Sequence, residues 1–190
     1  MPTKIRQVFA LDKNDSKGKG RFNLLCSLNY SHEQLAAAEQ IVIGEPEDVG
    51  GVDDSEYVAR VLEDPSHVTM AEHGLAYTPG AFGDCSKWGL SVQRMKLTSD
   101  EEIQAFGTAK AKATSRTYRG YAVGKVSVLR EKVSEDSQSR LFGVFATPLP
   151  GVPSHADVYS LSSNRLDKEK LKAYLWEVFN LDSHFPAPTA

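Results

Sequence analysis

Residues 119–161 constrain the fold more than any other part of the chain, because they contain the features of three successive strands. The predicted strands cover residues 119–131, 140–147 and 154–161, and no helical pattern separates them. Between the second and third strands, residues 148–153 hold three prolines and a glycine, which favours a tight turn. Strands that follow one another in this way predict a meander, and therefore an antiparallel sheet.

Three to four helices are expected to pack on this sheet. Two capping boxes, beginning at Ser31 and Ser99, each place Gln or Glu three residues further on and mark helix starts. Two other segments have apolar residues at helical spacing. The predicted helices are residues 32–40, residues 55–63, a segment from Ser99 to about Thr114, and residues 167–180, which are expected to cover one face of the sheet.

The remaining segments complete the expected α+β class. Residues 4–11 are predicted to form a short opening strand, and residues 21–28 fit either a strand or a helix. There is no internal repeat and no βαβ alternation, so an antiparallel sheet is favoured over a parallel one. Residues 1–180 are expected to form a single globular domain, followed by a flexible tail at residues 181–190.

Composition excludes several classes of protein. The net charge of −3 argues against binding to polyanions through bulk charge, and no apolar run approaches the length of a membrane span. The first residues lack the apolar core of a signal peptide. Cys26 and Cys85 form no CxxC pair, so they indicate reduced thiols, although Cys85 beside Lys87 could also be a nucleophile. We expect a cytoplasmic protein that does not associate with membranes.

Charge is distributed unevenly along the chain. Residues 45–64 hold eight acidic side chains and one base, Arg60, whereas residues 108–132 hold seven bases and one acid, Glu131. This asymmetry is typical of a nucleic-acid-binding face. It also fits two faces that attract each other, within one molecule or across a homo-oligomer. The sequence leaves both interpretations open.

The best candidates for catalysis are His155 and Asp157, which lie two residues apart in the third predicted strand. Alternate residues of a strand point to the same face, so their backbones would be roughly 7 Å apart and their side chains close together. Because Ala156 and Val158 are expected to face the core, the polar pair is expected to face a cleft or water. An imidazole and a carboxylate so placed can flank a substrate atom or bind one metal ion.

Other residues complete the predicted site. His67 or His73 would supply a second proton-transfer group, and with the first pair they would make four ligands for a divalent metal, the cofactor that the sequence leaves open. Tyr118 and Tyr121 are interleaved with the bases of residues 110–130, and bases with aromatic residues suit phosphate contacts and base stacking. The predicted phosphate-binding residues are Arg116, Tyr118, Arg119 and Lys125.

Two hypotheses for function follow. In the first, the chain is a nuclease- or nucleotide-directed hydrolase, comparable to small toxin or defence proteins, in which His155 is the general acid or base and Asp157 orients it. In the second, the chain is a non-catalytic protein–protein interaction module or a subunit of a complex, which binds a protein partner or another copy of itself through its charged faces.

Overall fold

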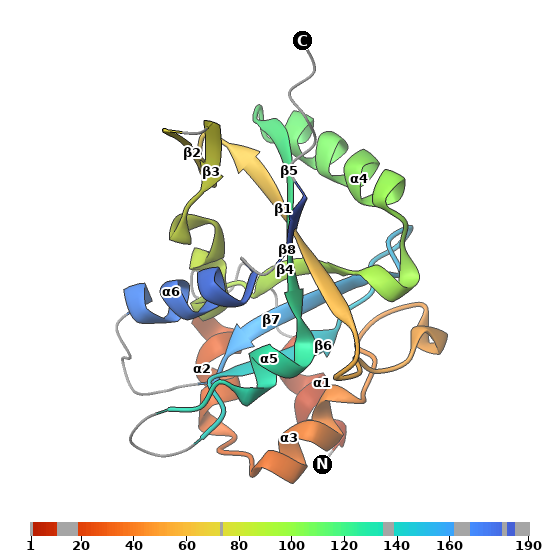
Figure 1. Ribbon diagram of the computed structural model, residues 1–190. Helices are drawn as coiled ribbons and strands as arrows, with labels where there is room; N and C mark the ends of the chain where they lie inside the picture. The colour runs from red at the N-terminus through yellow and green to blue at the C-terminus, as the bar shows by residue number, and fades with distance from the viewer. Residues whose placement is uncertain are drawn as a thin grey trace.

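The computed structural model describes residues 2–10, 19–72, 74–134, 139–161, 168–179 and 182–184. At its centre is an antiparallel sheet of six strands in the order β6-β7-β4-β1-β5-β8 (Figure 1). These strands are β1 (Tyr57–Asp64), β4 (Leu90–Arg94), β5 (Thr117–Lys125), β6 (Phe142–Ala146), β7 (His155–Ser160) and β8 (Asp182–His184). A separate hairpin pairs β2 (Val68–Ala71) with β3 (Gly74–Tyr77). The predicted α+β class with an antiparallel sheet is confirmed.

Helices are more numerous than the three to four expected. The described residues include the α-helices α1 (Pro2–Ala10), α2 (Lys19–Ser27), α3 (His32–Glu39), α4 (Asp100–Ala113), α5 (Val126–Glu131) and α6 (Lys168–Phe179). They also include the 3-10 helices η2 (Glu47–Val49), η3 (Pro79–Ser86) and η4 (Met95–Leu97). Both predicted capping boxes are confirmed, because Ser31 and Ser99 accept hydrogen bonds from the backbone three residues further on.

Both faces of the sheet are covered. On one face, η3, α5 and α6 pack on the largest apolar cluster, and Leu175 of α6 is fully buried there. On the opposite face, α1, α2 and α3 lie over the end formed by β6 and β7, where their apolar side chains surround Phe145 and Tyr159. On that same face α4 lies over β1 and β5, with Ile103 in its apolar cluster. The strands that lie between these two layers of helices are therefore buried on both faces.

The predicted meander is wrong in its first strand. β6 and β7 form the expected hairpin, but β5 lies on the other side of β1, so that β7, β4 and β1 separate it from β6. Residues 126–131, predicted as the end of that strand, form α5 instead. The cause is long-range pairing, because β5 pairs along the whole of β1, more than 50 residues earlier in the chain. Turn residues predict only that two consecutive strands are joined by a tight turn, and they do not predict the pairing of strands that are distant in sequence.

Two helix and strand predictions are also exchanged. Residues 55–63, predicted to be a helix, belong largely to β1, and residues 4–11, predicted to be a strand, belong largely to α1. β1 is buried from Val58 to Glu63 because helices cover both of its faces. A strand buried on both sides does not show the two-residue alternation by which strands are recognised. Residues 21–28, which the sequence left open, lie mainly in α2.

The C-terminal segment is described in part. Asp182–His184, in the expected flexible tail, form β8 against Tyr121–Val123 of β5. The other residues of the tail lie outside the described residues. Among the described helices, none combines the length and the apolar character that crossing a membrane requires.

Candidate functional site

His155 and Asp157 share one face of β7, as the sequence predicted, but this face does not open to a cleft or to water. His155 is 3% exposed and Asp157 is fully buried. The expectation failed because helices α1, α2 and α3 pack on the same face of the sheet, around Phe145 and Tyr159. The pair is therefore enclosed, and a substrate can react with it only through a neighbouring side chain that is itself accessible.

That neighbouring side chain is Ser91 of β4. In the ladder between β4 and β7, Ser91 lies directly opposite Asp157, and Gln93 lies opposite His155. β4 runs between the two apolar clusters of this face, so its polar residues meet the polar residues of β7 at the junction of the clusters. Ser91 is half-buried, and its Oγ lies 2.6 Å from His155 Nε2.

The hydrogen bonds of the imidazole define its tautomer. His155 Nδ1 lies 2.7 Å from the carbonyl oxygen of Thr147, the residue that follows β6. A carbonyl oxygen can only accept, so Nδ1 carries the hydrogen, and in the neutral ring Nε2 is then an acceptor. The hydroxyl of Ser91 therefore donates to Nε2. This is the arrangement of a serine nucleophile and its general base.

Asp157 completes the polar cluster. Its Oδ2 accepts a hydrogen bond of 3.2 Å from the Thr147 hydroxyl, and its Oδ1 lies 4.0 Å from His155 Nε2. A carboxylate at that distance favours the charged form of the ring. The imidazole can therefore take a proton from Ser91 while a negative charge is close enough to stabilise the resulting cation.

The path of the chain into β4 depends on Tyr159, on the same face of β7. The Tyr159 hydroxyl donates a hydrogen bond of 2.6 Å to the carbonyl oxygen of Trp88. Gly89 follows with φ of 86°, and a Cβ built there would lie 2.6 Å from the Tyr159 ring. Glycine is required on both counts. This contact fixes the backbone two residues before Ser91.

Arg60 of β1 binds the backbone of Ser91 through a hydrogen bond to its carbonyl oxygen. This arginine is 2% exposed, and its Nη1 donates a hydrogen bond of 3.0 Å to the Ser91 carbonyl oxygen. Its Nε donates to the Ala81 carbonyl oxygen at 3.1 Å, and its Nη2 lies 3.4 Å from Asp84 Oδ2. Burial lowers the pKa of the guanidinium, and the charge of Asp84 opposes this effect. The backbone of Ser91 is thus fixed by a buried cation.

His67 does not join this cluster. It lies in the turn after β1, where its Nδ1 accepts a hydrogen bond of 3.2 Å from the Glu63 backbone N–H. Ala59 is level with His155 in the sheet, and Glu63 is four residues further along β1 and two strands away. Strand geometry therefore places Glu63 roughly 16 Å from His155. Burial lowers the pKa of His67 to about 4. His73, the other predicted partner, lies outside the described residues.

The predicted phosphate-binding residues also lie elsewhere, on β5 and just before it. Arg116 pairs with Glu63 at 2.9 Å, and Arg119 pairs with Asp64 at 2.8 Å. Lys125 lies over the ring of Tyr57, 6.0 Å from its centroid. The ring of Tyr118 packs where a Cβ on Gly107 would stand, and desolvation raises the pKa of Tyr118 to about 12.

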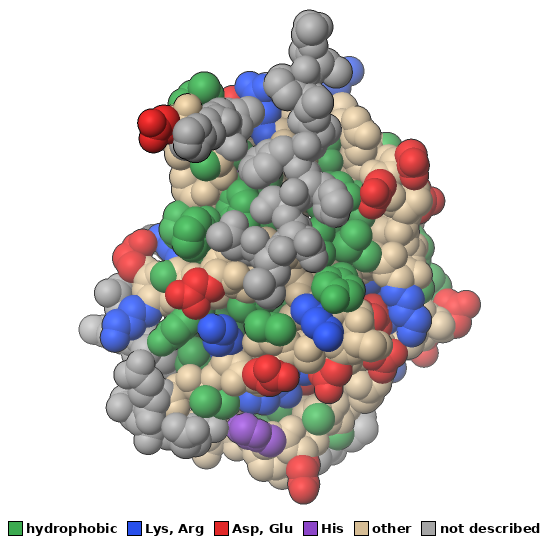
Figure 2. All heavy atoms as spheres, viewed as in Figure 1, with side chains coloured by type: hydrophobic (Ala, Val, Ile, Leu, Met, Phe, Trp, Pro, Cys, Tyr) green, Lys and Arg blue, Asp and Glu red, His purple; other side chains and the backbone are tan. Residues whose placement is uncertain are grey.

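These pairs explain the uneven distribution of charge along the sequence. β1 carries part of the acidic segment and β5 part of the basic one, and the two strands pair side by side. The ion pairs between the two segments are Lys110–Glu63, Arg116–Glu63, Arg119–Asp64 and Arg130–Asp54. The interpretation that the two segments attract each other within one molecule is confirmed for these residues. On the face shown in Figure 2, acidic and basic side chains are accordingly interspersed.

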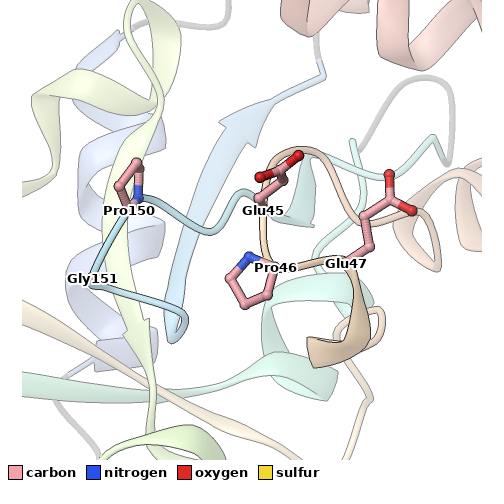
Figure 3. A pocket seen from close by; sticks show the side chains of 5 residues that line it. All are labelled: Glu45, Pro46, Glu47, Pro150 and Gly151. Atoms are coloured by element: carbon pink, nitrogen blue, oxygen red, sulfur yellow. The ribbon is translucent and has the colours of Figure 1, made fainter.

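A cavity of about 490 Å³ lies at the turn between β6 and β7, apart from the polar cluster. Glu45, Pro46 and Glu47 form one wall, and Pro150 and Gly151 of the turn form the other (Figure 3). None of the residues around Ser91 lines it. Within the described part of the chain, no group of three or more His, Cys, Asp or Glu side chains is placed to hold a metal ion.

The sequence pattern predicted a site at His155 and Asp157 but did not point to Ser91 and Thr147, which contact them in the structure. The sequence carries a signal for Ser91, because it alternates with the apolar residues Leu90 and Val92, which are buried in the largest apolar cluster, so that Ser91 faces the other side of the sheet. No protein-family model, curated protein or solved structure matches this chain.

Proposed function

We propose that this chain is a hydrolase in which Ser91 is the nucleophile and His155 is the general base. The observation that supports this most directly is the 2.6 Å contact between Ser91 Oγ and His155 Nε2, with Nδ1 held by a carbonyl oxygen. A nucleophile, a base within hydrogen-bond reach and a third group that orients the base are the parts that such a mechanism needs. The substrate class that we propose is an ester or a related acyl compound.

The proposed reaction has two halves. Ser91 Oγ attacks the carbonyl carbon while its proton passes to His155 Nε2, and Asp157 stabilises the imidazolium. The bond to the leaving group then breaks, and the leaving alcohol takes the proton from Nε2. In the second half, water attacks the acyl-serine and gives its proton to Nε2. The release of the carboxylic acid restores the serine and the neutral ring.

An acyl substrate is favoured over a phosphodiester by the position of the bases. Arg119 lies three strands from β7, at the bulge in β5 opposite Leu62 and Glu63, which are three and four residues from the level of His155, so strand geometry separates the two backbones by roughly 20 Å. Arg116 and Arg119 are also paired with carboxylates of β1. The nuclease hypothesis, which needs these cations beside His155, therefore has less support than a serine hydrolase.

The test is turnover of p-nitrophenyl esters by the wild-type chain and three variants. Ser91→Ala and His155→Gln are each expected to lower kcat by at least a hundredfold, because each removes a reacting group. Ser127→Ala, which alters another half-buried serine in α5, is the matched control and is expected to leave the rate unchanged. Equal rates for wild type and Ser91→Ala, with both chains folded, would contradict the proposal.

A further inference from the structure

Thr147 contacts both residues that flank Ser91 in the proposed site, through two different atoms. Its carbonyl oxygen accepts from His155 Nδ1 at 2.7 Å, and its hydroxyl oxygen lies 3.0 Å from the same nitrogen. The hydroxyl hydrogen is then free to donate to Asp157 Oδ2, 3.2 Å away. The ring and the carboxylate are therefore linked through one side chain, which is itself buried.

The hairpin places Thr147 at this position. The ladder between β6 and β7 ends with Ala146 opposite Ala156, and the Thr147 N–H continues it by donating to the His155 carbonyl oxygen at 3.2 Å. Beyond Thr147, Leu149 and Val152 exchange two backbone hydrogen bonds and close the turn. The backbone on both sides of the site is thus fixed by the hairpin, and the Thr147 hydroxyl is oriented with it.

We propose that Thr147 is the positioning residue of this site, which holds the hydrogen on His155 Nδ1 and keeps the carboxylate of Asp157 beside the ring. This inference rests on the proposed function, because it assigns to Thr147 the role of orienting the general base. Thr147 touches no reacting atom. It acts through His155 and Asp157, in the way that outer partners orient the groups that react.

Among the described residues, charged and titratable groups near His155 lie on β7, β1 and α2. Asp157 lies on the same strand, and Arg60 of β1 is close enough to Asp157 for their charges to attract. Tyr159 lies two residues beyond Asp157, and Arg21 of α2 contacts its hydroxyl. The carboxylate of Asp157 lies 4.0 Å from the ring. A change in how this carboxylate is held is therefore expected to alter the titration of His155.

Two substitutions separate the hydroxyl from the methyl group of Thr147. Thr147→Val keeps the shape and the carbonyl oxygen but removes the donor to Asp157. The carboxylate, without that donor, attracts the imidazolium more strongly, so His155 should hold its proton to a pH about half a unit higher or more. Turnover at neutral pH should fall roughly tenfold, since the base is less well oriented. Thr147→Ser restores the hydroxyl and should titrate as the wild type does, with a lower Tm from the lost methyl group.

The measurement is NMR titration of the His155 ring, assigned by its absence in His155→Gln, together with ester turnover across pH. Asp157→Asn gives a second variant in case Thr147→Val does not fold, and it should shift the His155 titration to lower pH. Unchanged His155 titration in Thr147→Val, or equal behaviour of the Val and Ser variants, would overturn the inference. A shifted titration with no effect of Ser91→Ala on turnover would instead support the role of Thr147 and refute the serine hydrolase.

Discussion

At the residue scale, buried polar side chains distinguish this molecule. His155, Asp157, Arg60 and Arg94 are all at most 3% exposed, and each has partners inside the sheet or beneath it. Arg94, for example, donates to both carboxylate oxygens of Glu56 and to the carbonyl oxygens of Val49, Gly50 and Gly51. A buried charge needs such partners, because desolvation without them costs several kcal/mol. Single substitutions at these positions are therefore expected to have large effects.

His67 provides a prediction for stability against pH. Its pKa is lowered to about 4 in the folded chain, mainly by burial, and returns to its usual value near 6.5 on unfolding. Between these values the unfolded chain binds more protons, so the free energy of unfolding decreases as pH falls, by about 3 kcal/mol in total. His67→Asn keeps an acceptor for the Glu63 N–H and cannot titrate. Urea unfolding at pH 7 and pH 4.5 should show a smaller decrease for the variant, and equal decreases would count against this assignment.

The cysteines provide a second prediction at this scale. Cys85 is 1% exposed, and burial raises the pKa of its thiol to about 12, while burial raises that of Cys26 to about 11. Thiolates rather than thiols react with alkylating reagents. Iodoacetamide at pH 8 should therefore leave Cys85 unmodified in the folded chain and modify both cysteines in urea. Rapid alkylation of native Cys85 would revive its alternative interpretation as a nucleophile.

At the element scale, the predictions that succeeded rest on local signals. Examples are the capping boxes at Ser31 and Ser99 and the Pro/Gly turn between β6 and β7, which depend only on interactions between residues a few positions apart. The errors over β1 and β5 arise because the partners of these strands are distant in sequence and both of their faces are covered. Long-range pairing also limited the prediction of the site. The pairing of β4 with β7 brings Ser91 beside His155, and no local pattern near either residue in the sequence predicts that pairing.

A substitution in helix α6 tests how this helix packs on the sheet. The sequence predicted that residues 167–180 would cover the sheet, and Leu175 is fully buried in the apolar cluster beneath α6. Truncation of a leucine in such a place removes buried methyl groups and leaves a cavity, which costs about 2–5 kcal/mol. Leu175→Ala should lower the free energy of chemical unfolding by that amount. Lys170→Ala, at an exposed position of the same helix, should change it by less than about 0.5 kcal/mol.

At the scale of the whole molecule, the two polar regions of the sheet are separate. The acidic end of β1 pairs with Arg116 and Arg119 near one end of the sheet, while the cluster around Ser91 lies between β4 and β7. The uneven charge of the sequence is thus balanced largely where these strands meet. This arrangement gives less support to an interaction module based on opposite charged faces than the sequence alone did.

Because the ion pairs between β1 and β5 are separate from the cluster around Ser91, a substitution in one region is expected not to affect the other. Arg119 is 36% exposed and Asp64 is 33% exposed, so their ion pair contributes at most about 1 kcal/mol. Arg119→Gln should lower the unfolding free energy by no more than that and leave ester turnover unchanged. A large loss of turnover in this variant, measured with the chain fully folded, would instead place the basic residues in the functional site and favour the nuclease hypothesis.

The most direct test of the central claim is covalent labelling of the folded chain with a fluorophosphonate, followed by peptide mapping. The reagent transfers its phosphonyl group to an activated serine and releases fluoride, so the adduct identifies the nucleophile without knowledge of the substrate. If Ser91 is activated by His155, a single adduct should form on Ser91 and should be absent in His155→Gln. No adduct on the folded wild-type chain, or one that maps to another residue and persists in that variant, would contradict the claim.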